Sequence, residues 1–208
     1  WHNISVVDPL FTLPLSTLVI FAAVRRRRYL ALLGLCWALA YLAIGTVQHQ
    51  RALAAAEQLV INRGHTPSRL EVKPGFANLL VWKTIYEWNG RYFVDAIRAG
   101  ITSSMIPGDS VAKFDVSEDF PWLDPDSQQA TDIERFRWFS DNWLALDKND
   151  PHLVTDMRYS QLPNEIKGLW GIRVLKGRAA NEHVEWITQR ETSDAEIKEF
   201  IQQLKGEH

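Results

Sequence analysis

Two apolar runs lie on either side of four consecutive arginines, at positions 25–28, near the beginning of this 208-residue chain. The second run, residues 29–47, contains no charged side chain. It has the length of roughly 20 residues that an α-helix needs to cross a hydrocarbon core of about 30 Å. The first run, residues 4–24, is also long enough, but a carboxylate and two prolines in its first half predict an irregular or kinked entry. We therefore predict two transmembrane helices.

The arginines, Arg25 to Arg28, form a very short loop between these two runs. Positively charged loops stay on the cytoplasmic side of a membrane. We therefore expect both outer ends of the hairpin, and every residue after Val47, to lie outside the cytoplasm, which is the periplasm in a bacterium with two membranes. A cleaved signal peptide does not explain the first run, because its basic residues follow the apolar stretch and a second span comes directly after.

Charge and cysteine usage exclude several classes of function. The formal net charge is −2, so there is no excess of basic side chains to neutralise phosphates, and nucleic acid is not an expected partner. Cys36 is the only cysteine, so neither an internal disulfide nor a Cys-rich zinc site can form. Cys36 lies within the second apolar run, where a small apolar side chain that faces lipid or a neighbouring helix is its simplest explanation.

The second span is expected to continue beyond the membrane as a helix. Residues 48–62 are alanine-rich and favour helix, and Gly64 is well placed to end it. The juxtamembrane segment therefore predicts a stiff connection between the anchor and the rest of the chain.

A β-hairpin is the clearest signal in the second half of the sequence. Two β-rich runs, residues 78–88 and 91–97, flank Asn89-Gly90, the dipeptide most favourable to a type I′ turn. Alternation along the first run predicts an aromatic face, which includes Trp82 and needs to be covered by another element.

Residues 100–129 are expected to be a loop, because they contain Pro-Gly and an acidic, proline-containing stretch. A capping box that begins at Thr131 predicts a short helix through about Asn142. A second capping box, at Ser193, opens a terminal helix whose apolar stripe is expected to dock on the sheet and which ends at Gly206.

Three further strands are expected to extend the hairpin into an antiparallel sheet, at residues 153–158, 169–175 and 183–188. The predicted fold class is therefore α+β, with two transmembrane helices followed by a soluble domain that contains an antiparallel sheet and flanking helices.

The expected organisation has three parts. Residues 1–48 form the two-helix membrane anchor, residues 49–68 a juxtamembrane helix and linker, and residues 69–208 the extracytoplasmic α+β domain. The sequence has no initiator methionine and enters the first apolar run at once, so we expect Trp1 to lie inside a longer protein.

No motif for nucleophilic catalysis, phosphate binding or a paired-cysteine site occurs in the sequence. The one chemically unusual residue is Asp8, a carboxylate just inside an apolar segment, because ionisable groups there are costly and usually have a purpose. A helix N-cap followed by Pro9 at the first helical position is an equally good explanation, and a cap and a functional role can coexist.

Several stretches together resemble the downstream part of a family of membrane-bound predicted metal-dependent hydrolases, the LexA-regulated, YdjM-like family. The most specific pieces are Asp8-Pro9-Leu10 at the membrane entry and residues 78–82 at the start of the hairpin. The resemblance covers most of the chain, except the acidic loop in the middle, and is carried by WHNISVVDPLFTLPL, QHQRALAAAEQLV, PGFANLLVWKTIYEWNGRYFV and DMRYSQLPNEIKGLWGI.

The resemblance implies a hydrolase of the bacterial inner membrane with a divalent metal, whose main His and Asp ligands belong to helices upstream of Trp1. Asp8 is then a metal ligand or orients a metal-bound water. His2 is a weaker candidate that the family pattern does not support. Membrane lipids and the upstream helices are the expected partners, and the membrane location suggests a lipid or envelope substrate. The alternative is a non-catalytic, membrane-tethered periplasmic domain that binds a partner or acts as a scaffold.

Overall fold

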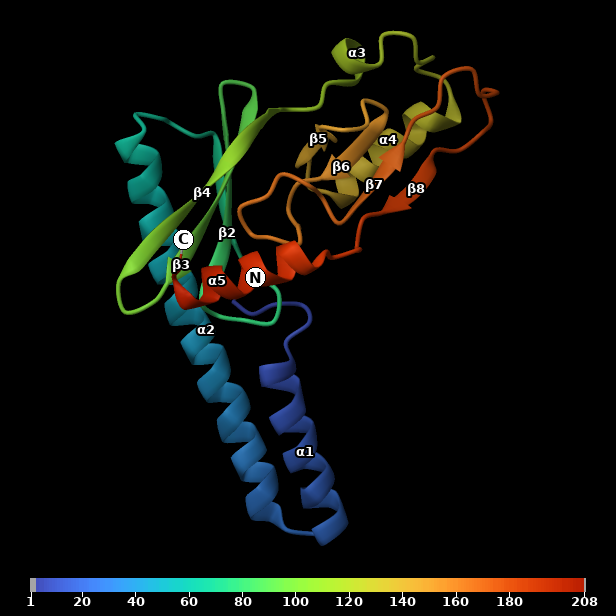
Figure 1. Cartoon of the computed structure of the whole chain (residues 1–208). Coiled ribbons are helices and arrows are strands. Elements are labelled where there is room, and N and C mark those ends of the chain that lie inside the picture. The colour runs from blue at the N-terminus through green and yellow to red at the C-terminus, as the bar shows by residue number, and fades with distance from the viewer. Residues whose placement is uncertain (1–2, 208) are drawn as a thin grey trace.

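The computed structural model, which describes residues 3–207, begins with a hairpin of two helices that extends away from a β-rich domain (Figure 1). Helix α1 spans Pro9–Arg25 and helix α2 spans Arg28–Asn62. Arg26, with φ at 50°, ends α1 in the left-handed conformation, so that the chain reverses within the arginine loop. As the carboxylate and prolines predicted, the chain before Pro9 is irregular.

Helix α2 is long and apolar enough to cross a membrane, with a mean hydropathy of 2.1 in its most apolar window. Helix α1 is a shorter apolar helix of 17 residues. By length and composition, α2 is the one helix among residues 3–207 that meets this condition. The second membrane crossing, predicted for residues 4–24, stays a prediction.

The first sheet contains four antiparallel strands in the order β1-β2-β3-β4. Strands β2 (Val81–Trp88) and β3 (Arg91–Ala99) form the predicted hairpin. Asn89 and Gly90 have φ angles of 49° and 70°, as a type I′ turn requires. The outer strands are β1 (Arg69–Pro74) and β4 (Ser103–Ala112), and β4 lies in the stretch that was predicted to be a loop.

The second half of α2 covers one face of the first sheet. Ala52 and Ala56 are fully buried there against Trp82 and Ile97. Their small side chains let the helix approach the sheet closely, and the aromatic face predicted from the alternation of β2 is covered in this way. One helix thus continues from the apolar hairpin onto the sheet.

The later strands were predicted to extend the first sheet. This prediction was wrong, because they form a second sheet. Strands β5 (Leu144–Leu146), β6 (Leu153–Asp156), β7 (Trp170–Arg173) and β8 (Glu185–Thr188) pair antiparallel in this order. One physical reason is that β1 and β4 already occupy both edges of the hairpin, so β6 cannot pair directly with β2 or β3. The α+β class is therefore confirmed, with two four-stranded sheets.

Three helices accompany the sheets. Helix α3 (Val116–Asp119) is short, and α4 (Gln128–Phe139) packs Ile133 and Phe136 into the core of the second sheet. The predicted start of α4 at Thr131 was wrong, because the side chain of Ser127 accepts a hydrogen bond from Ala130 N and caps the helix earlier.

Helix α5 (Asp194–Lys205) begins with the predicted capping box at Ser193 and ends at Gly206. Leu204 packs against Val81 and Ile106, so the helix docks on the first sheet as expected.

The face of the first sheet opposite α2 packs against the second unit, which consists of the second sheet and the segments that connect its strands. Ile85, Tyr92 and Val94 are fully buried there against Trp143 and Met157. The first sheet is therefore enclosed between α2 on one side and the second sheet's connections on the other.

A close backbone approach at Gly45 predicts a sharp difference between two glycines of α2. A Cβ at Gly45 would collide with the backbone oxygen of Asn3, whereas a Cβ at Gly34 would lie 3.5 Å from Leu18, an ordinary contact. We expect Gly45→Ala to lower the free energy of unfolding by about 1–3 kcal/mol. Gly34→Ala, the matched control, should be neutral or raise it by up to about 1 kcal/mol through helix propensity.

Thermal unfolding of the detergent-solubilised variants measures both effects. Equal stability of the two variants would contradict the close approach at Gly45.

Candidate functional site

Asp8 lies at the junction of the helix hairpin and the domain, and only 3% of it is exposed. One carboxylate oxygen accepts a hydrogen bond from the backbone N of Phe11 at 3.2 Å, which makes Asp8 the N-cap of α1. The other oxygen accepts a hydrogen bond from the hydroxyl of Tyr41 at 2.8 Å. The ring of Tyr41 also contacts Phe11 and Trp37, so the carboxylate is held within an aromatic enclosure. The predicted cap, with Pro9 following it, is confirmed.

A metal at Asp8 would need ligands that the described residues do not supply. Among residues 3–207, no three His, Cys, Asp or Glu side chains gather closely enough to hold a metal ion. Each oxygen of Asp8 keeps a second lone pair, so the carboxylate could still contribute one bond to an ion. The role of Asp8 as a ligand therefore stays a prediction, and His2 lies outside the described residues.

A second group of charged side chains lies between the first sheet and the second unit, and sequence reasoning missed it. Lys73 pairs with Glu71 at 2.7 Å, and the other oxygen of Glu71 accepts a hydrogen bond from Trp143 Nε1 at 2.8 Å. Burial by itself raises the pKa of Glu71, but the hydrogen bonds from Lys73 and Trp143 bring it below its usual value. The carboxylate is therefore ionised at neutral pH.

Lys83 is as deeply buried as Lys73, but the hydrogen bonds of its ammonium go to neutral groups. Its ammonium donates hydrogen bonds to Ser160 Oγ at 2.8 Å and to the carbonyl of Glu165 at 2.6 Å. Burial lowers the pKa of Lys83 from 10.5 to about 7, although the nearby carboxylates Glu165 and Asp156 oppose the shift. A buried amine of this kind is able to exchange a proton near neutral pH.

The hydrogen-bond directions show what this lysine does in the fold. Ser160 donates its own hydroxyl proton to the carbonyl of Leu162 at 2.6 Å, so that proton is directed away from the amine of Lys83. Lys83 therefore fixes the segment after β6 to the first sheet, and Ser160 is not arranged as an activated nucleophile.

Asp156 anchors the same segment from the second sheet. It is completely buried, pairs with Arg158 at 2.7 Å and accepts a hydrogen bond from Trp170 Nε1 at 3.2 Å. Buried carboxylates of this kind need such partners, because an unpaired charge would be strongly destabilising.

A third polar cluster closes the end of α2 that is remote from the hairpin. Arg63 forms a two-point ion pair with Asp95 at 2.6 and 2.9 Å, and it also donates to the hydroxyl of Tyr86 at 3.0 Å. His65 contacts the same hydroxyl at 2.9 Å and stacks on Trp88 with 3.7 Å between ring centres. These contacts fix the C-terminal end of α2 to the sheet.

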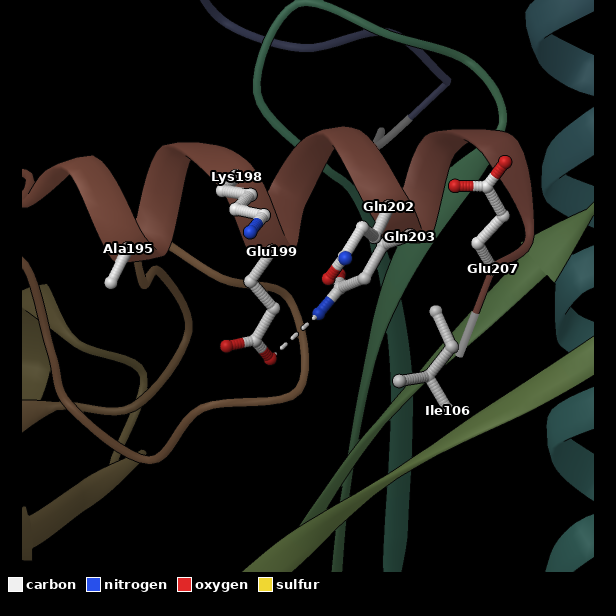
Figure 2. Close-up of a pocket in the computed structure, with 7 residues that line it drawn as sticks. All are labelled: Ile106, Ala195, Lys198, Glu199, Gln202, Gln203 and Glu207. Atoms are coloured by element: carbon white, nitrogen blue, oxygen red, sulfur yellow. Dashed lines mark hydrogen bonds between the residues drawn. The ribbon is translucent and has the colours of Figure 1, made fainter.

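A small cleft of about 430 Å³ lies between α5 and β4 (Figure 2). Gln203 reaches into it and donates hydrogen bonds to Asn164 at 2.8 Å and Glu199 at 3.4 Å. Its side-chain oxygen is buried and has no hydrogen-bond partner among the described residues. Its remaining walls come from both apolar and polar residues, namely Ile106, Ala195, Lys198, Gln202 and Glu207.

The sequence matches no protein-family model. It matches no curated protein. No solved structure matches the fold.

The Asp8 cap predicts that the charge and the shape of this side chain contribute differently to stability. Asp8→Ala removes both acceptors and should lower the free energy of unfolding by about 1–3 kcal/mol. Asp8→Asn keeps a capping oxygen and should cost roughly 1 kcal/mol or less. Tyr41→Phe removes only the hydrogen bond from the Tyr41 hydroxyl to Asp8, and so measures that bond by itself. Thermal unfolding in detergent compares all three, and an equal loss for Ala and Asn would mean that the cap does not carry the effect.

The lowered pKa of Lys83 predicts that the free energy of unfolding depends on pH. Because its folded pKa of about 7 lies below its usual value of 10.5, the unfolded chain binds more protons between these two pH values. Lys83 therefore makes the wild type more stable as the pH rises through this range, and its penalty is largest below pH 7. We expect the wild type to gain stability relative to Lys83→Met from neutral to alkaline pH.

Denaturant unfolding of both proteins at several pH values measures this difference. Lys205→Met, which changes an exposed lysine of α5, serves as the control and should show no such trend. A pH-independent difference between wild type and Lys83→Met would contradict the lowered pKa.

Proposed function

We propose that this chain is the C-terminal portion of a metal-dependent hydrolase of the bacterial inner membrane, with a membrane-inserted helix hairpin and a periplasmic α+β domain. The observation that carries the membrane part is the surface of the hairpin. More than half of the large apolar side chains exposed in residues 3–207 lie on α1 and α2. Water-soluble surfaces rarely expose a continuous apolar area of this size. The exposed set on the hairpin is Leu10, Leu13, Val19, Ile20, Phe21, Val24, Tyr29, Leu32, Leu33, Leu35, Leu39, Ile44 and Val47, and Ile61 is exposed at the remote end of α2.

The position of the arginines supports the orientation of the hairpin. Arg25 and Arg28 lie at its tip, at the opposite end from both sheets (Figure 1). With this charge on the cytoplasmic side, the sheets lie on the periplasmic side.

The proposed hydrolase activity rests on the resemblance described above and on the position of Asp8. In this proposal the main ligands of a divalent metal belong to upstream helices of the full protein, and Asp8 is a further ligand or orients a water on the metal. Such a metal would lower the pKa of a bound water and polarise an ester or phosphate bond. Asp8 contributes a buried, oriented carboxylate where the hairpin meets the domain, which favours a lipid or envelope substrate.

A non-catalytic periplasmic binding or scaffold domain is the second candidate. It is favoured by an exposed aromatic patch on α4 and β8. Trp186 is 56% exposed and its ring centre lies 6.5 Å from that of Phe139, which is 48% exposed, and Trp138 on the same helix as Phe139 is 86% exposed. Exposed aromatic side chains of this kind are common in interaction surfaces.

Reporter fusions test the membrane orientation. Alkaline phosphatase fused to the C-terminus should be active, whereas the same enzyme inserted between Arg26 and Arg27 should be inactive, because it folds only outside the cytoplasm. The reverse pattern would overturn the orientation, and activity at both sites would show that α1 and α2 do not form a membrane-spanning hairpin.

Metal analysis of the purified full-length protein tests the hydrolase. We expect one or two equivalents of a divalent metal in the wild type. Asp8→Asn keeps the helix cap but weakens a ligand, so metal affinity should fall roughly 10–100-fold, with thermal stability of the metal-free protein nearly unchanged. A wild type without bound metal would favour the scaffold function. Full metal retention in Asp8→Asn would remove Asp8 from the site.

A further inference from the structure

Outside the helix hairpin, exposed apolar side chains are concentrated in four separate segments of the chain. Val6 precedes α1 and is 90% exposed. Phe76, 59% exposed, lies in the connection between β1 and β2, and Ile101, completely exposed, lies between β3 and β4. Ile197 on α5 is 47% exposed. These segments are remote in sequence, so their position relative to the hairpin decides whether they form one surface.

Contacts of Gln48 place two of these segments at the end of the apolar run. Gln48 directly follows Val47, where the predicted span ends. Its side-chain nitrogen donates to the carbonyl of Leu79 at 3.2 Å and to that of Ala99 at 2.7 Å. The β1–β2 and β3–β4 connections therefore meet α2 at the same level along the hairpin.

Arg51, one turn further along α2, holds the second connection in place. It donates hydrogen bonds to the carbonyls of Gly100 and Ile101, the latter at 3.0 Å. The segment before α1 lies at the same level, because Asn3 donates a hydrogen bond to Thr46 at 2.7 Å. The segment before α1 and the β1–β2 and β3–β4 connections thus all contact α2 near the point where its apolar half ends.

Helix α5 completes this surface. Arg98, at the end of β3, donates a hydrogen bond from Nε to the carbonyl of Leu204 at 3.0 Å, which fixes α5 beside the β3–β4 connection. In Figure 1, α5 runs across the molecule between the sheets and the start of α1, close to the end of α2 that carries the first sheet. Its residues Glu199 and Gln203 face the cleft (Figure 2), whereas Ile197 and Ile201, one turn apart, share a face that does not line it.

We infer that these exposed side chains form an apolar collar, made of Val6, Phe76, Leu80, Ile101, Ile197 and Ile201, that rests in the interface of the bilayer that holds the hairpin. The inference rests on the proposed membrane insertion and adds a second lipid contact to it. Its members come from the segment before α1, from two strand connections that meet α2 at the same level, and from α5, which is fixed beside one of these connections. Lys198 and Lys205 are exposed on α5 beside Ile197 and Ile201, where they are able to contact lipid phosphates.

The collar has a consequence for the rest of the molecule. A hairpin alone leaves a domain free to tilt, whereas lipid contacts on several sides of α2 hold the first sheet at a fixed height and angle. Asp8 bonds to Tyr41, seven residues before Gln48 on α2, so it then lies on the membrane side of the collar. Helix α4 and strand β8, which carry the exposed residues Trp138, Phe139 and Trp186, lie in the part of the domain that is remote from the hairpin (Figure 1), so these side chains remain in the periplasm.

Site-specific fluorescence in lipid nanodiscs tests the collar. Cys36→Ala provides a cysteine-free chain, into which single cysteines are introduced by Phe76→Cys, Ile101→Cys or Ile197→Cys and labelled with an environment-sensitive dye. All three positions are exposed, so the labels do not disturb a core. In nanodiscs of phosphatidylethanolamine and phosphatidylglycerol with a spin-labelled lipid near the headgroup, we expect quenching roughly twofold or more above that at Trp138→Cys and Trp186→Cys.

Val19→Cys, on an exposed face of α1, distinguishes this inference from the membrane insertion itself. If the dye at Val19 is quenched by a deep spin label and the dyes at the collar are not quenched beyond the Trp138 and Trp186 controls, the collar is wrong and the anchor stands. If the dye at Val19 is not quenched either, the insertion of the hairpin fails and the collar fails with it.

Discussion

The continuity of α2 is the constraint on which the other parts of the structure depend. Its first half carries large apolar side chains that no other described element covers, and its second half carries the buried alanines Ala52 and Ala56, against which the first sheet lies. Since an α-helix is stiff over this length, the direction of the hairpin sets the direction of the sheet. The second unit packs on the opposite face of that sheet, so its position follows from α2 through one intermediate layer.

Local signals in the sequence were sufficient for the elements whose cause is local. The type I′ turn at Asn89-Gly90 and the capping box at Ser193 specify their backbone within four residues, and both occur as predicted. Strand β4 was missed because Pro107 and Gly108 are typical of loops and because its outer face is exposed, which hides the alternation that marks a strand. This omission also explains the wrong prediction of a single extended sheet, since β4 fills the edge that later strands were expected to join.

The candidate site was predictable only as far as it is local. The cap at Asp8 follows from its position before Pro9, whereas its second partner, Tyr41, is 33 residues away and no local pattern indicates it. The charged group at Glu71, Lys73 and Lys83 is harder still, because charged residues at alternate strand positions normally indicate a face in water. That face is buried because Trp143 and the segment from Ser160 to Glu165 pack over it.

The contacts of Asp8 also limit what its carboxylate is able to do. Both of its donors, the backbone N–H of Phe11 and the hydroxyl of Tyr41, are neutral, so they orient the two oxygens without cancelling a negative charge. The N-terminus of α1 offers a partial positive charge of about half a unit, which is smaller than the charge of the carboxylate. An ionised Asp8 therefore leaves a residual negative charge in a nearly dry enclosure, a setting in which a cation bound next to it is strongly attracted. A cap requires only an oxygen acceptor, which asparagine would also provide, so Asp8→Asn separates the capping role of this side chain from any role that needs its charge.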